Sequence, residues 1–180
     1  MARIEPVQRN TADTNTAELL QSVEKKMGKV INILGTMAHS PVVLKAFLGF
    51  SQSLSEGSLS PSLRERIALA IGEATGCNYC VAAHTGLARK AGLTEEEILD
   101  ARRGTSSDEK VAVALDLALK IVKEQGFVGD EDIERVRSKG YCDGEICEIV
   151  ACVALNLFTN YFNHVADTDI DFPAVPALSA

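Results

Sequence analysis

Two cysteines and a histidine in the middle of the chain are the residues best suited to chemistry. Cys77 and Cys80 are separated by two residues, and His84 follows four positions after Cys80. Residues three and four positions apart lie on the same face of an α-helix. The spacing therefore predicts one row that holds both sulfurs and the imidazole, with the two cysteines near enough to form a disulfide.

A helix that begins at these cysteines favours the ionised form of their thiols. Gly76 marks a break in the chain directly before it. Cysteines in the first turn of a helix feel the positive end of the helix dipole, which favours thiolate over thiol. A neighbouring imidazole, here that of His84, can take the thiol proton or pair with the thiolate. The pattern is typical of a redox site or a peroxide-reducing thiol site.

Two other interpretations of the same residues stay open. Cys77, Cys80 and His84 can supply three ligands of a catalytic zinc ion whose fourth ligand is water. The two cysteines can also be small buried apolar residues without chemistry. The histidine favours the redox interpretation, under which we expect neither a metal ion nor an organic cofactor.

Composition argues against two classes of partner. The net charge of −7 gives no electrostatic support for nucleic-acid binding. The longest uninterrupted apolar run, residues 149–155, is far shorter than the roughly 20 residues of a membrane span, and residues 1–6 lack the apolar core of a signal peptide. We therefore expect a cytoplasmic protein, in which a disulfide is usually catalytic or sensing rather than structural.

The periodicity of apolar residues predicts an all-α fold. No segment alternates convincingly as a strand does, and 180 residues are enough for one domain, 1–180, with a sizeable core. We expect a compact orthogonal bundle of about six to eight helices, preceded by an extended arm over residues 1–15. Ser60-Pro61 is a helix-start signal, and the helix that follows it pairs with the cysteine-bearing helix over residues 61–92.

Glu65 lies on the helix before the cysteines and has two interpretations. It can close a capping box with Ser62 at the start of its helix. It can also direct a carboxylate at the cysteine site from that helix. Spacing alone does not distinguish Glu65 from Glu73 for the second role.

The last helix begins near Asp143 and is apolar on nearly all sides, which predicts burial in the centre of the domain or between subunits. A narrow polar stripe interrupts it, formed by Asn156, Asn160, Asn163 and His164. Buried amides need partners, so the stripe either bonds to backbone or lines a wet cavity.

Cys142, Cys147 and Cys152 are five positions apart and cannot share a helical face, so we interpret them as packing residues.

Two parts of the chain resemble a known family. Residues 59–66, the segment from Gly76 to His84 and residues 88–93 are similar to alkylhydroperoxidase D-like proteins, which belong to the carboxymuconolactone decarboxylase superfamily. The ending Asn163-His164-Val165-Ala166-Asp167, followed by Asp171-Phe172-Pro173, resembles the peroxidase-related subgroup. The resemblance implies an all-helical protein that assembles as homotrimers or hexamers.

The resemblance also implies a role for each site residue. Glu65 corresponds to the family's carboxylate, Cys77 to its resolving cysteine, Cys80 to its peroxidatic cysteine and His84 to its proton carrier. The implied partners are a peroxide substrate and an external dithiol reductant of the lipoyl or thioredoxin type. The well-studied alkylhydroperoxidase D has a second histidine directly before its peroxidatic cysteine. Tyr79 takes that position here, and its hydroxyl can still donate to an oxyanion.

The predicted function is therefore a thiol-dependent peroxidase with an antioxidant role. Cys80, not Cys77, is one helical turn from His84, so its thiolate is the better candidate for attack on a peroxide bond. Two alternatives remain. One is a lyase that decarboxylates a small organic acid, as founding members of the superfamily do without a cysteine pair. The other is a non-enzymatic oligomeric protein whose cysteines sense redox state.

Overall fold

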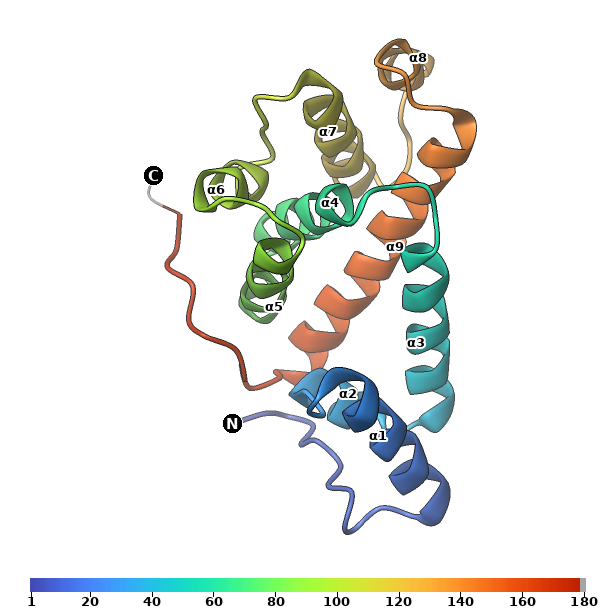
Figure 1. Ribbon diagram of the computed structural model, residues 1–180, viewed down its shortest axis with the longest axis vertical. Coiled ribbons are helices and arrows are strands. Elements are labelled where there is room, and N and C mark those ends of the chain that lie inside the picture. The colour runs from blue at the N-terminus through green and yellow to red at the C-terminus, as the bar shows by residue number, and fades with distance from the viewer. Residues whose placement is uncertain (179–180) are drawn as a thin grey trace.

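Nine helices follow one another along residues 1–178, the part of the chain that this computed structural model describes, and no strand occurs there (Figure 1). They are α1 (Thr14–Met27), α2 (Asn32–Met37), α3 (Pro41–Ser55), α4 (Pro61–Ala74), α5 (Asn78–Lys90), α6 (Glu95–Arg102), α7 (Glu109–Lys123), α8 (Asp130–Ser138) and α9 (Asp143–Ala166). The expected all-α fold is confirmed. The count exceeds the predicted range by one because α2, with six residues, forms a helix of its own.

Helix α4 is the central element and packs against α5, α6, α7 and α9. The start signal before it acts as expected, since the Ser60 hydroxyl accepts a hydrogen bond from the backbone N–H of Leu63 at 3.2 Å. The chain then turns from α4 into α5 through Gly76, whose φ of 71° lies in the left-handed region that favours glycine. This short turn places the start of α5 beside the end of α4.

The apolar residues form two main clusters, with a third, smaller one beneath α6. The larger cluster joins α4, α7 and α9, and its fully buried members include Ile67, Leu115 and Ile149. The second cluster joins α1, α2, α3 and the first turn of α5. Cys77 and Cys80 belong to this second cluster, so the predicted chemistry lies where two halves of the bundle meet.

Helix α9 runs the length of the bundle beside α3, α4, α5 and α7 (Figure 1). By length and composition it could cross a membrane, a test that core helices of soluble proteins also pass. One face is buried in the core, but Val150, Phe158 and Tyr161 are between 41% and 55% exposed. The single chain therefore leaves part of α9 uncovered, and burial of that part between subunits stays a prediction.

The N-terminal arm lies on its own chain. The backbone N–H groups of Arg3 and Ile4 donate to the Ala166 carbonyl at 2.8 and 3.1 Å, and Val7 N–H donates to the Gly35 carbonyl at 3.0 Å. Helix α1 begins at Thr14, slightly earlier than expected. The arm thus ties the end of α9 to α2 across the second cluster.

Glu148 of α9 holds the turn that leads into α4. Its two carboxylate oxygens accept hydrogen bonds from the backbone N–H groups of Ser58 and Leu59, both at 2.9 Å. These donors, that of Ser58 first, lower the pKa of the Glu148 carboxyl. A Cβ at Gly57 would lie 2.6 Å from the carboxylate, so a larger residue there would displace the Glu148 side chain.

Candidate active site

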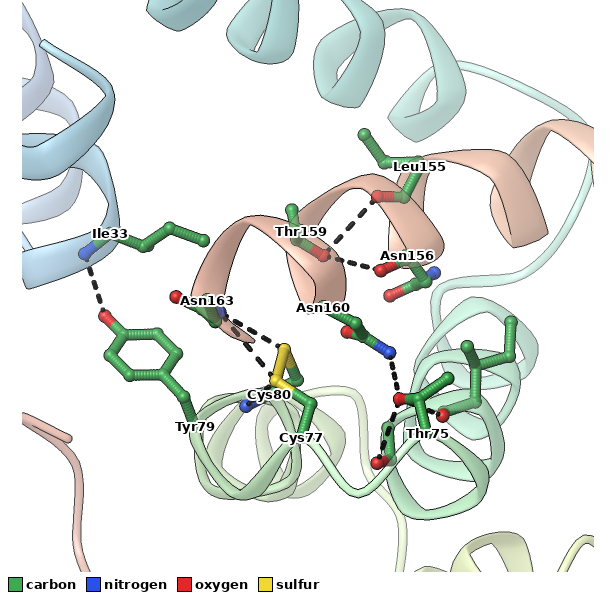
Figure 2. Close-up of a disulfide and its surroundings, with 12 residues drawn as sticks. Ile33, Thr75, Cys77, Tyr79, Cys80, Leu155, Asn156, Thr159, Asn160 and Asn163 are labelled. Atoms are coloured by element: carbon green, nitrogen blue, oxygen red, sulfur yellow. Dashed lines mark hydrogen bonds between the residues drawn. A yellow bond between two sulfur atoms is a disulfide. The ribbon is translucent and has the colours of Figure 1, made fainter. Parts of the chain in front are cut away.

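Cys77 and Cys80 lie at the start of α5 and are joined by a disulfide, with their Cα atoms 5.3 Å apart (Figure 2). Cys77 is the N-cap residue of α5, and its sulfur accepts a hydrogen bond from the backbone N–H of Cys80 at 3.3 Å. A helix N-terminus favours negative charge. The structure therefore brings the two sulfurs together at the electropositive end of a helix, as the spacing predicts.

The disulfide is buried within the single chain. Cys77 is 1% exposed and Cys80 is 3% exposed. Gly72 on α4 permits the close approach of α5, since a Cβ there would lie 3.2 Å from the Val81 side chain and 3.6 Å from Cβ of Cys80. A small oxidant is compatible with this burial, whereas a larger reductant requires the sulfurs to become accessible.

Glu65 and His84 form a pair across the α4–α5 hairpin. Oε2 of Glu65 lies 2.7 Å from Nδ1 of His84, and both side chains are about one-fifth exposed. A carboxylate on Nδ1 retains the proton there and leaves Nε2 of the neutral ring as the base. Within residues 1–178 no hydrogen bond joins His84 to either sulfur of the disulfide.

The two open questions about Glu65 are decided by this geometry. The capping-box interpretation with Ser62 is wrong, because Ser60 caps α4 and the Glu65 carboxylate bonds to His84. Glu73 instead accepts a hydrogen bond from Nε of Arg102 on α6 at 2.8 Å. Glu65 is thus the carboxylate that meets the cysteine-bearing helix at its histidine.

Tyr79 points away from the disulfide, toward α2 (Figure 2). Its hydroxyl donates to Oδ1 of Asp171 at 2.8 Å and accepts from the backbone N–H of Ile33 at 3.2 Å. Its ring packs edge-on against Phe172, and burial raises the pKa of its hydroxyl. In this arrangement the hydroxyl proton is directed at Asp171 and not at the sulfurs.

The polar stripe of α9 divides into residues with different partners. Asn156 Nδ2 donates to the Cys152 carbonyl one turn back, and Asn160 Nδ2 donates to Oγ1 of Thr75, both at 2.8 Å. Asn163 Nδ2 points at the disulfide, 3.3 Å from the sulfur of Cys80 (Figure 2). His164 is exposed and does not belong to the buried row. Sequence analysis placed Asn163 in the stripe but assigned it no role.

The remaining cysteines differ from one another. Cys142 and Cys147 are exposed, so the packing interpretation is wrong for both. Cys142 is the N-cap residue of α9, and Cys147 lies on an exposed side of that helix. Cys152 is buried, and burial raises the pKa of its thiol to about 11.

The zinc interpretation finds no support in the geometry. Among residues 1–178, no group of three or more His, Cys, Asp and Glu side chains is placed to hold a metal ion. The two sulfurs are bonded to each other, and the imidazole is paired with Glu65.

Sequence comparison shows which known family this site resembles. Residues 41–124, which include the disulfide and the Glu65–His84 pair, match the sequence model of the Carboxymuconolactone decarboxylase family. The chain is also similar to "Uncharacterized protein YdfG" of Bacillus subtilis (strain 168). The two are 28% identical over 103 residues, which cover 54% of this chain and 69% of that protein.

Solved structures extend the likeness to almost the whole chain. An uncharacterized peroxidase-related protein of Ralstonia eutropha JMP134, described as an alkylhydroperoxidase AhpD core, is 24% identical with a TM-score of 0.85, covering 94% of this chain and 92% of that one. The debrominase Bmp8 in complex with 2,3,4-tribromopyrrole is 23% identical with a TM-score of 0.79, covering 93% and 91%. A peroxidase-related protein of Silicibacter sp. TM1040 is 24% identical with a TM-score of 0.79, covering 92% and 91%. These likenesses establish that this chain has the fold of the AhpD core.

Proposed function

We propose that this protein is a thiol-dependent peroxidase that reduces an alkyl hydroperoxide or hydrogen peroxide through the Cys77–Cys80 couple. The observation that carries the proposal is a disulfide at the N-terminus of α5, followed one turn later by a histidine held by a carboxylate. The match to the Carboxymuconolactone decarboxylase family model and the fold likeness to peroxidase-related proteins support it. Its biological role would be antioxidant, in the cytoplasm.

The reaction begins from the reduced pair. The Cys80 thiolate attacks one oxygen of the peroxide bond, so the S–O bond forms as the O–O bond breaks. Cys80 becomes a sulfenic acid, and the leaving alkoxide or hydroxide takes a proton to become an alcohol or water. The thiol of Cys77 then displaces the sulfenic hydroxyl as water, which closes the disulfide.

His84 and Glu65 supply and accept the proton. Nε2 of His84 takes the thiol proton of Cys80 and returns it to the leaving oxygen, while Glu65 holds Nδ1–H and stabilises the charged ring. The hydrogen bond to Glu65 thus selects the His84 tautomer that carries its proton on Nδ1 and leaves Nε2 free to accept a proton.

An external dithiol closes the cycle. Its thiolate attacks one sulfur of the disulfide and its second thiol releases the mixed disulfide, leaving the reductant oxidised and both cysteines reduced. Lipoyl- and thioredoxin-type proteins are the expected partners. Because the disulfide is at most 3% exposed, we expect reduction to need a local opening of the first turn of α5.

The cysteine variants test this function. Cys80→Ser is expected to abolish peroxide consumption, whereas Cys77→Ser is expected to stop after one turnover with a trapped sulfenic acid on Cys80. Mass spectrometry of the Cys77–Cys80 peptide before and after one equivalent of peroxide identifies both species. Cys147→Ser, which removes an exposed thiol outside the site, serves as the control. Wild-type turnover by Cys80→Ser would refute the proposal.

The same assays separate the alternatives. Activity that survives loss of both cysteines would indicate a lyase on a small organic acid, and a single oxidation that no dithiol reverses would indicate a redox sensor. The fold likeness to a debrominase favours one further candidate, reductive debromination. There the dithiol supplies two electrons and two protons, so an aryl bromide yields the arene, hydrogen bromide and the disulfide. Bromide release without peroxide consumption would select it.

We also propose that the chain forms a homo-oligomer, a trimer or a hexamer. An apolar row at helical spacing stays exposed along α9 in the single chain, formed by Val150, Phe158, Tyr161 and Val165. Light scattering after size exclusion measures the assembly, and a monomer would exclude it.

A further inference from the structure

We propose that Asn163 is a catalytic residue, whose side-chain amide donates a hydrogen bond to the Cys80 thiolate and stabilises it as the nucleophile. The inference rests on the proposed function in one respect, the use of Cys80 as the attacking sulfur. It adds a residue from α9 to a site that is otherwise built from α4 and α5.

The amide lies directly on the reacting atoms. Nδ2 of Asn163 is 3.3 Å from the sulfur of Cys80 and 3.8 Å from that of Cys77. Figure 2 shows the side chain reaching from α9 toward both sulfurs at the first turn of α5. Asn163 is 5% exposed, so water does not weaken this contact.

A comparison with the neighbouring amides indicates that this contact is not structural. Asn156 satisfies a backbone carbonyl, and Asn160 binds a hydroxyl that itself bonds to the end of α4. Within residues 1–178, Asn163 Nδ2 has only the sulfurs as acceptors, and its Oδ1 is buried without a partner. Burying an amide without full hydrogen bonding costs stability. A disulfide sulfur is a weak acceptor and returns little of that cost, whereas a thiolate is charged and accepts strongly.

The two sulfurs need different donors because of their positions on α5. Cys77 is the N-cap residue, so its sulfur reaches a free backbone N–H of the first turn, that of Cys80. Cys80 lies within the first turn, and its sulfur accepts no backbone N–H among the described residues. The side chain of Asn163 supplies the hydrogen-bond donor that α5 does not offer to the sulfur of Cys80, which lies one turn before His84. The side chain thus favours ionisation at the position where the peroxide is attacked.

The test measures the ionisation of Cys80 without using peroxide. In a Cys77→Ser background, alkylation of Cys80 by iodoacetamide is followed against pH by mass spectrometry of its peptide. A hydrogen bond to a charged group corresponds to about one to two pH units. We therefore expect Asn163→Leu to move the alkylation midpoint up by about that amount, which lowers the thiolate fraction below the midpoint by about 10- to 100-fold.

Asn160→Leu is the matched control. It removes a buried amide with an unpaired oxygen on the same helix, three residues earlier, but its donor serves Thr75 and not a sulfur. Its midpoint is expected to equal that of the parent. Asn163→Asp, which keeps the shape and replaces the donor by a charge of the same sign as the thiolate, is expected to move the midpoint upward as well. It provides the measurement if the leucine variant does not fold.

The outcomes separate this inference from the proposed function. Equal midpoints in the parent and in the folded Asn163 variants would overturn the role of Asn163, as would an equal shift in Asn160→Leu. If the wild-type protein consumes no peroxide, the proposed peroxidase function is refuted. The alkylation midpoints of Cys80 would still decide whether the Asn163 amide stabilises the thiolate.

Discussion

Replacing Tyr79 by phenylalanine should reduce stability strongly while leaving the chemistry of the cysteines unchanged. The hydroxyl of Tyr79 is the only group within the described residues that accepts the backbone N–H of Ile33. Ile33 is the second residue of α2, where a helix offers that N–H no partner of its own. The same hydroxyl donates to Asp171, which anchors the C-terminal segment.

The magnitude follows from these partners. Leaving a buried N–H unsatisfied costs about 1–3 kcal/mol, and losing a hydrogen bond to a carboxylate adds about 1 kcal/mol. The second cost is small because Asp171 keeps the backbone N–H of Asn32 and Nζ of Lys29, both at 3.3 Å. We expect a loss of about 2–4 kcal/mol, and a fall in Tm on the order of 10 °C for a domain of this size.

Tyr141→Phe is the matched control. Tyr141 is buried to a similar extent, but within residues 1–178 its hydroxyl makes one hydrogen bond, to the Lys110 carbonyl at 3.1 Å. Its loss should cost about 1 kcal/mol. Thermal and urea unfolding measure both variants, and the alkylation midpoint of Cys80 measures the chemistry, which should match the parent in each.

Two results would refute this reasoning. A Tyr79→Phe protein as stable as Tyr141→Phe would show that the hydroxyl does not hold α2 and the C-terminal segment. A folded Tyr79→Phe protein with a displaced Cys80 midpoint or slower peroxide reduction would place the hydroxyl in the proton relay after all.

Three further predictions concern groups outside the Cys77–Cys80 disulfide. At pH 8 iodoacetamide should label Cys147 but not Cys152 in the folded protein, because burial raises the pKa of the Cys152 thiol to about 11; rapid labelling of Cys152 would contradict this. Glu148→Gln should lower Tm at pH 7 and lower it progressively less as the pH falls below 4.5, because the Glu148 carboxylate stabilises the fold while it is ionised and its pKa is lowered in the folded protein. Arg102→Met should speed carboxypeptidase trimming of the C-terminal segment, since Nη2 of Arg102 binds the Pro176 carbonyl at 2.9 Å; trimming at the wild-type rate would exclude that anchor.

The parts of the site that depend on local sequence were predictable. Ser60-Pro61 starts α4, and Gly76 separates it from α5, because capping and left-handed backbone depend on single residues. The three-residue spacing of Cys77 and Cys80 brings their sulfurs together, because residues three positions apart lie on one face of a helix.

Other assignments depended on contacts between helices. Glu65 and Glu73 both lie on α4, and only the positions of α5 and α6 direct one to His84 and the other to Arg102. The packing of α9 likewise left Cys147 outside the core while Cys152 lies inside it. Helical periodicity defines faces, but it does not say which neighbour covers each face.

The amino-acid sequence alone determined an all-helical chain and a helix that starts with two cysteines one turn before a histidine. Only the tertiary structure decided that Asn163, 83 residues beyond Cys80, donates to its sulfur, and that the hydroxyl of Tyr79 turns to Asp171 instead. The reason is physical. Backbone hydrogen bonds fix positions within one helix, whereas the partners of side chains on different helices depend on how those helices pack, which the spacing along the chain does not specify.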